Sequence, residues 1–120
     1  MVLIELKSEQ EFESYIRQNK VNYVMFTMDG CGPCQQMKQI ITRDYQQFKI
    51  LLINIKYIQK DLNTRLAIKG LPTFAKYMNG KRLGSFAGGD VARLRRMLQS
   101  SISSNGSDWN SESNQNSYYR

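Results

Sequence analysis

Histidine is absent from this chain of 120 residues, and cysteine and proline occur only twice each. Without histidine, the side chains cannot form a Ser-His-Asp triad or a Cys-His nucleophile pair. A tetrahedral zinc site takes three or four protein ligands, mostly Cys and His, so two cysteines cannot build one. These absences leave the two cysteines themselves as the candidates for chemistry.

Long apolar runs are also missing. No stretch approaches the ~20 apolar residues that a membrane-spanning helix needs. Residues 1–7 carry no basic leader region, and their short apolar run is more typical of a first strand than of a secretory signal. We therefore expect a protein with no membrane association and a cytoplasmic location, or a nuclear one.

The two cysteines, Cys31 and Cys34, lie three positions apart. In a reducing compartment, such close spacing indicates reversible dithiol chemistry rather than a structural bridge. An apolar strand pattern precedes the pair and a helical pattern follows it, so Cys31 is expected at a helix N-terminus. That position lowers the pKa of a thiol, because the helix end favours negative charge. Pro33 suits the first helical turn, and Cys34 lies one turn further on.

The hydropathy pattern predicts the element order βαβαβαββα, which makes an α/β fold. We expect strands at 2–6, 21–27, 50–55, 73–78 and 82–87, helices beginning near Ser8, Cys31 and Asp90, and a short helix carrying Ile58, Leu62, Leu66 and Ile68. Ser8 and Glu11 form a capping box, and Asn79-Gly80 is a strong hairpin signal. Helical crossovers imply parallel strands, and the final hairpin adds an antiparallel edge.

The composition changes from Ser100 onward, where serine, asparagine and glycine dominate and the apolar period stops after Ile102. Such a segment cannot bury enough apolar surface to fold by itself. The sequence therefore predicts one domain at 1–102 and a disordered Ser/Asn-rich C-terminal tail at 103–120.

Over about residues 1–102, the chain resembles the short cytosolic-type thioredoxins, as a divergent member. The resemblance rests on Cys31-Gly32-Pro33-Cys34, Leu71-Pro72-Thr73-Phe74, Asn79-Gly80-Lys81 and Phe86-Ala87-Gly88. It implies a thioredoxin fold, with a central mixed sheet of about five strands and about four flanking helices. It also implies a protein-disulfide reductase in which Cys31 attacks the substrate and Cys34 resolves the mixed disulfide.

The resemblance assigns further roles. Gly32 and Pro33 support the active site, and the residues implied in substrate binding are Gly30, Leu71, Pro72, Thr73 and Gly88. The peptide bond before Pro72 is implied to be cis. No cofactor is implied beyond the redox-active Cys31–Cys34 disulfide, and no metal. The implied partners are disulfide-containing protein substrates and a thioredoxin reductase, and we expect a monomer.

Several residues depart from the family pattern. Gly30 stands where thioredoxins usually have tryptophan, and Met25 stands where they have a buried aspartate that helps to take the proton from the resolving thiol. Gln35 and Gln39 replace a basic residue and a kinking proline. Lys56 lies in a segment that is usually acidic. These departures indicate a specialised reductant rather than a general one.

Two alternatives stay open beside the reductase. One is a thioredoxin-fold binding module with weak redox activity that acts through a basic surface; the other is an oxidase or isomerase of the secretory pathway, which the Gly-Pro between the cysteines disfavours. The net charge is +7, and residues 1–104 hold 16 basic and 8 acidic side chains. Such a body favours an acidic protein or a nucleic-acid-associated partner. The candidate patch comprises Arg93, Arg95 and Arg96, extended by Lys76, Lys81 and Arg82.

Overall fold

The computed structural model describes residues 2–58 and 68–99. Its strands are β1 (Leu3–Leu6), β2 (Asn22–Thr27), β3 (Ile50–Asn54), β4 (Thr73–Met78) and β5 (Lys81–Ala87). Its helices are α1 (Glu9–Ile16), α2 (Gly32–Asp44), α4 (Val91–Gln99) and a 3-10 turn, η1 (Ile55–Tyr57). Most of the short helix expected around 58–68, and the tail expected at 103–120, lie outside the described residues. In the described part, no helix is long and apolar enough to cross a membrane.

The five strands form one mixed sheet in the order β1-β3-β2-β4-β5. Both β1 and β2 run parallel to β3, while β4 runs antiparallel to β2 and to β5. This arrangement confirms the predicted α/β class, the parallel crossovers and the antiparallel hairpin. Because β1, β2 and β3 are parallel, their carboxyl ends meet at one edge of the sheet.

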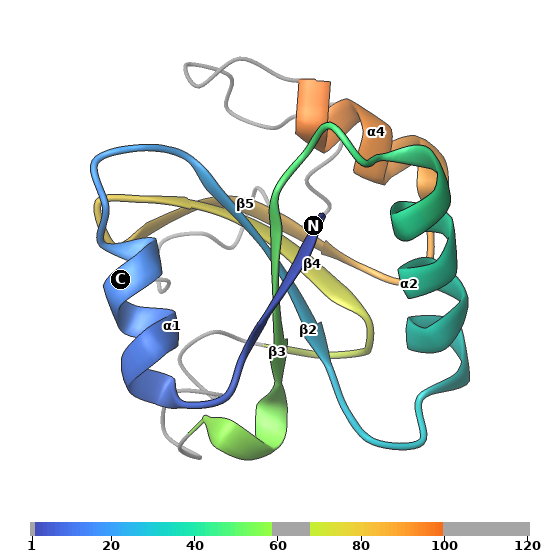
Figure 1. The fold of residues 1–120 in the computed structure, drawn as a ribbon, viewed down its shortest axis with the longest axis horizontal. Coiled ribbons are helices and arrows are strands. Elements are labelled where there is room, and N and C mark those ends of the chain that lie inside the picture. Colours follow the sequence, from blue (N-terminus) through green and yellow to red (C-terminus); the bar gives the residue numbers. More distant parts are fainter. Residues whose placement is uncertain (1, 59–67, 100–120) are drawn as a thin grey trace.

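The helices cover both faces of the sheet, with α1 on one side and α2 and α4 on the other (Figure 1). Strand β2 serves both faces, because successive side chains point in opposite directions. Phe26 packs edge-on against Phe12 of α1, with ring centroids 5.7 Å apart. Its neighbour Met25 belongs to the opposite core, with Met37 of α2 and Leu94 of α4.

Local sequence signals place the helix starts and the hairpin as predicted. The Ser8 Oγ accepts a hydrogen bond of 3.1 Å from the Glu11 N–H, as a helix cap should. Asp90 caps α4 in the same way, accepting from the Arg93 N–H at 3.1 Å. Residues 79 and 80 both have positive φ angles, 55° and 79°, which suit the Asn-Gly pair of a tight hairpin.

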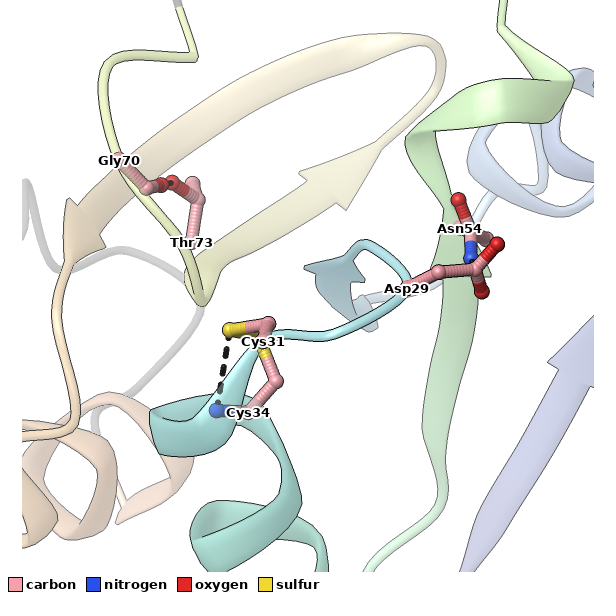
Figure 2. The surroundings of a disulfide bond; sticks show 6 residues. All are labelled: Asp29, Cys31, Cys34, Asn54, Gly70 and Thr73. Atoms are coloured by element: carbon pink, nitrogen blue, oxygen red, sulfur yellow. Dashed lines mark hydrogen bonds between the residues drawn. A yellow bond between two sulfur atoms is a disulfide. The ribbon is translucent and has the colours of Figure 1, made fainter.

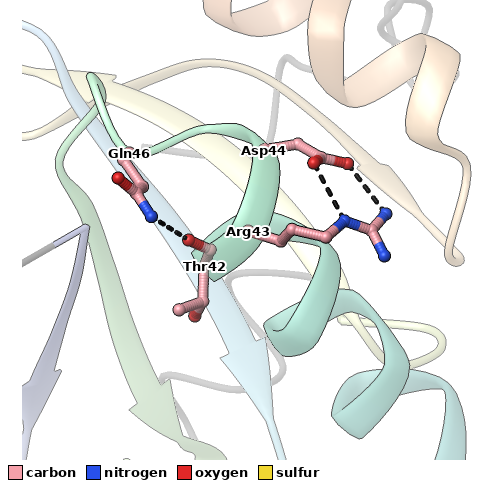
Figure 3. A network of polar contacts seen from close by, with 4 residues as sticks. All are labelled: Thr42, Arg43, Asp44 and Gln46. Carbon is pink, nitrogen blue, oxygen red and sulfur yellow. Dashed lines mark hydrogen bonds and ion pairs between the residues drawn. The ribbon is translucent and has the colours of Figure 1, made fainter.

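The helical pattern after the cysteines runs on to Phe48, but α2 ends at Asp44. The Gln46 amide donates to the Thr42 carbonyl at 3.0 Å, so a side chain takes one of the carbonyls that the helix end leaves unpaired (Figure 3). Beside it, the Arg43 guanidinium forms two hydrogen bonds to the Asp44 carboxylate, at 2.9 and 2.8 Å. These bonds hold the pKa of Asp44 below its ordinary value.

Candidate active site

The two cysteines are joined by a disulfide bond at the beginning of α2, and their Cα atoms lie 5.2 Å apart. Cys31 is the N-cap residue of this helix, and its Sγ accepts a hydrogen bond of 3.2 Å from the Cys34 N–H (Figure 2). Pro33 occupies the first turn, where its missing N–H costs nothing. After reduction, the same N–H and the helix dipole stabilise a thiolate on Cys31.

The two sulfur positions differ in exposure. Cys34 is fully buried and packs in the core with Met25 and Met37, whereas Cys31 is only partly buried. Gly32 and Pro33, between them, are exposed. Only Cys31 is therefore presented to another molecule.

Cys31 opens into a shallow cleft of about 490 Å³. Four other predicted site residues line the same cleft: Gly30, Gly32, Pro33 and Leu71. The remaining lining residues are Met28, Ile55, Ile68, Lys69 and Gly70. Met28 is 46% exposed, which gives the cleft an apolar rim that was not predicted from the sequence. Its exposure depends on the path of the loop after β2, so the sequence held no signal for it.

The other predicted residues lie beside the cleft rather than in it. The Leu71–Pro72 peptide bond is cis, as the resemblance implied. The Gly88 N–H donates to the Pro72 carbonyl at 2.8 Å, and the Thr73 hydroxyl donates to the Gly70 carbonyl (Figure 2). Pro72 and Thr73 are buried, so these three residues hold Leu71 and Gly70 in place but do not line the cleft themselves.

Met25 is fully buried in the same core cluster as Cys34, as expected for the position where thioredoxins usually carry an aspartate. A thioether cannot take a proton from the Cys34 thiol. In the part of the chain that the structure describes, no group of three or more potential ligands could hold a metal ion. The site therefore offers dithiol chemistry without a nearby proton acceptor at residue 25.

The sequence missed a polar network on the loop before Cys31. One oxygen of Asp29 accepts from the Asn54 amide at 2.9 Å (Figure 2). The other pairs with the Lys56 ammonium at 3.4 Å. Lys56 is the basic residue in a segment that is usually acidic in thioredoxins, and its partner in the structure is Asp29. The network joins the loop to the end of β3. Both charged side chains are largely exposed, so the pair adds little stability.

The predicted basic patch is smaller than expected. Lys76 is fully buried and Arg82 is 7% exposed, so neither extends a surface patch. Lys76 lies opposite Tyr23 of β2, and the Tyr23 side chain packs on the core and reaches the Leu98 carbonyl of α4. Lys76 therefore leaves the sheet on the face that α2 and α4 cover. Arg95 and Arg96 are exposed on α4 as predicted, while Arg93 is partly buried with its guanidinium 5.7 Å from the Phe86 ring centroid.

A cysteine pair at the start of a helix, with one sulfur buried and the other open to a cleft, supports reversible thiol–disulfide exchange. Fold and site together define the class of thiol-disulfide oxidoreductases. The family model "Thioredoxin" matches residues 3–101, and the chain belongs to the thioredoxin family. It is accordingly a disulfide reductase of that family.

Proteins similar to the chain occur in an amoeba, a fish and an alga. It is 26% identical to "Thioredoxin-3" of Dictyostelium discoideum over 103 residues, covering 83% of this chain and 97% of the relative. It is 31% identical to "Thioredoxin" of Ictalurus punctatus, covering 67% and 78%. The structure of thioredoxin f2 from Chlamydomonas reinhardtii matches with a TM-score of 0.69 and 27% identity, covering 80% of this chain and 93% of that one.

Proposed function

We propose that Cys31 is the attacking thiol and Cys34 the resolving thiol of this reductase. The observation that carries the assignment is the difference in exposure, because a substrate disulfide can reach Cys31 from the cleft but cannot reach Cys34. The helix N-terminus adds to the difference by stabilising a thiolate on Cys31.

In this mechanism the reduced protein supplies two electrons. The Cys31 thiolate attacks one sulfur of the substrate disulfide, which forms a mixed disulfide and releases the other sulfur as a thiolate. The Cys34 thiol loses its proton and attacks the Cys31 sulfur. That step releases the second substrate thiolate and forms the Cys31–Cys34 disulfide. Since residue 25 is methionine, water or hydroxide takes the proton from Cys34.

The substrates of this proposal are disulfide-containing proteins that lie along the cleft and contact Gly30 and Leu71, with a thioredoxin reductase restoring the dithiol. The apolar rim at Met28 supports a protein substrate, because an exposed large apolar side chain beside a reactive group suits protein contact. The proposal places the protein in a reducing compartment, cytoplasmic or nuclear, where a dithiol is kept reduced.

Insulin reduction tests the proposal. The wild-type protein with a chemical reductant is expected to accelerate the precipitation of insulin chains, and Cys31→Ser is expected to abolish the acceleration. Cys34→Ser is expected to accumulate a mixed disulfide with substrate, which Cys31→Ser does not form. A wild-type protein without effect on insulin would favour the alternative of a binding module.

A second role, binding of an acidic partner, is favoured by the exposed Arg95 and Arg96 on α4. Electrostatic binding to a polyanion weakens steeply as the salt concentration rises, because binding releases counterions from the polyanion. Retention on heparin or duplex DNA at low salt is expected to fall in the double variant Arg95→Glu/Arg96→Glu. Equal retention of variant and wild type would remove this role and leave the reductase.

A further inference from the structure

A second cavity lies beside the Cys31 cleft, between α2 and the sheet edge where β1, β2 and β3 end. Its volume is about 200 Å³, and its wall is mostly polar. Glu5 of β1, Thr27 of β2 and Asn54 of β3 line it from the sheet, and Gln35 and Lys38 line it from α2. The carboxyl ends of parallel strands are a common place for ligand sites in α/β folds.

The strand register explains how the sheet contributes to this cavity. Glu5 pairs with Leu52, and Leu52 pairs with Met25 on its other side. Paired residues on adjacent strands point to the same face. Because Met25 packs in the core under α2, the Glu5 side chain leaves the sheet on that same face. Lys38 approaches from α2 and therefore faces the cavity from the opposite wall.

The cavity carries one cation and one anion that are not neutralised by protein groups. Among residues 2–58 and 68–99, the side chains of Glu5 and Lys38 form no hydrogen bond and no ion pair. Asp29 and Lys56, also in the wall, already pair with each other. The Thr27 hydroxyl is buried and has no partner in the described part of the chain. A ligand with both charges would complement this wall.

The cavity is close to the reactive sulfur. It shares Met28 and Gly30 with the cleft that Cys31 opens into, and Gly30 is the residue before Cys31. A volume of about 200 Å³ corresponds to about seven water molecules at ~30 Å³ each, which leaves room for an amino-acid group. A ligand seated here therefore lies beside the residue that precedes Cys31.

We propose that this cavity binds the zwitterionic amino-acid end of a small disulfide, with the ligand carboxylate toward Lys38 and its ammonium toward Glu5. The inference rests on the proposed reductase function, because the same dithiol performs the reaction. Cys31 attacks the nearer sulfur and releases the first small thiol. Cys34 then displaces the second small thiol and closes the Cys31–Cys34 disulfide, so two electrons and two protons pass to the ligand.

Three small disulfides test the proposal with the pre-reduced, desalted protein. L-cystine carries both charges, cystamine carries only the ammonium groups, and 3,3′-dithiodipropionate carries only the carboxylates. The readout is the second-order rate constant for protein oxidation, followed by acid quenching and mass spectrometry. Cystine is expected to react faster than either singly charged probe.

Two variants make the test specific. Lys38→Gln is expected to slow the reaction of cystine and dithiodipropionate about fivefold, the size expected for a partly exposed charge pair, and to leave cystamine unchanged. Glu5→Gln is expected to slow cystine and cystamine by a similar factor and to leave dithiodipropionate unchanged. Lys20→Gln, at an exposed position remote from the cavity wall, is the matched control and is expected to alter none of the three.

Insulin reduction by the same proteins separates this inference from the reductase proposal. Both cavity variants are expected to reduce insulin at the wild-type rate. The cavity proposal alone would be overturned if insulin reduction is normal but the wild-type protein shows no preference for cystine. The same conclusion would follow if insulin reduction is normal but Lys38→Gln or Glu5→Gln slows all three probes equally. If neither insulin nor cystine oxidises the reduced wild-type protein, both the reductase proposal and the cavity proposal would be overturned.

Discussion

The two cysteines lie three residues apart but in contrasting surroundings. Cys34 lies in a dry core with Met25 and Met37, while Cys31 faces a cleft with an exposed methionine and a polar cavity next to it. The difference shows how one helix turn separates two tasks. The buried side sets how readily the second thiol loses its proton, and the open side sets which disulfide reaches the first thiol.

The largest contrast is expected in thiol reactivity. During brief exposure of the reduced protein to iodoacetamide, Cys31 is expected to be alkylated at least ~10 times faster than Cys34. Cys31 is accessible, and its thiolate is stabilised by the helix end. Mass spectrometry of peptides at successive times gives both rates. Faster modification of Cys34 would reverse the assignment of attacking and resolving thiols.

The second test introduces a polar side chain into the buried surroundings of Cys34. Met25→Asp places a carboxyl in the core and is expected to lower the free energy of unfolding by about 1–3 kcal/mol. Burial disfavours the charged form, so the folded-state pKa of the new carboxyl is raised and the loss grows as pH rises through its ordinary value of about 3.9. Urea unfolding at several pH values measures both effects.

Met25→Leu is the matched control, since it keeps the volume and polarity and is expected to cost less than about 1.5 kcal/mol. The aspartate is also expected to speed the resolving step, because it supplies a proton acceptor beside Cys34. Unchanged stability in Met25→Asp would mean that residue 25 is not buried in solution.

The open side is tested at Gly30, whose φ angle of 76° lies in the left-handed region. A Cβ added there meets nothing within 4 Å, so the cost of Gly30→Ala is backbone strain alone, about 1 kcal/mol. Gly32→Ala is the control: its Cβ is also in open space, but the residue is helical, and a gain of about 0.4–1 kcal/mol is expected. Thermal unfolding of both oxidised variants is the measurement, and equal effects would contradict the loop conformation.

The smallest effect is expected at the far end of α2. The Arg43–Asp44 pair is exposed, so Asp44→Asn is expected to leave the unfolding midpoint unchanged at neutral pH within error. The pKa of Asp44 is lowered from 3.8 by the hydrogen bonds from Arg43, so any stability from the pair is present above that value and is lost as the pH falls below it. Calorimetry of both proteins across this range compares them, and a clear loss at neutral pH would show a stronger pair.

Much of the fold was predictable because its signals are local. The Ser8 cap, the Asp90 cap and the Asn79-Gly80 turn each depend on a few adjacent residues, and each is confirmed. The reciprocal bond of the predicted capping box differs by one residue, because the Glu11 carboxylate accepts from the Lys7 N–H at 2.7 Å instead of from the Ser8 N–H. The helical period that continued to Phe48 was misleading, because Tyr45 and Phe48 pack against the α2-side core from the turn that follows the helix. Periodicity records burial, and a turn that packs on the core can imitate a helix.

The sequence by itself determined the chemistry: two cysteines, no histidine, and a spacing that places both sulfurs at one helix end. Only the tertiary structure decided the surroundings of that dithiol. The sequence placed Lys76 on a basic surface, yet Lys76 is buried, because α2 and α4 cover the face of the sheet from which it projects. Glu5 and Lys38 are 33 positions apart and share a cavity for the same reason: a parallel sheet gathers distant strand ends at one edge, and α2 closes over them.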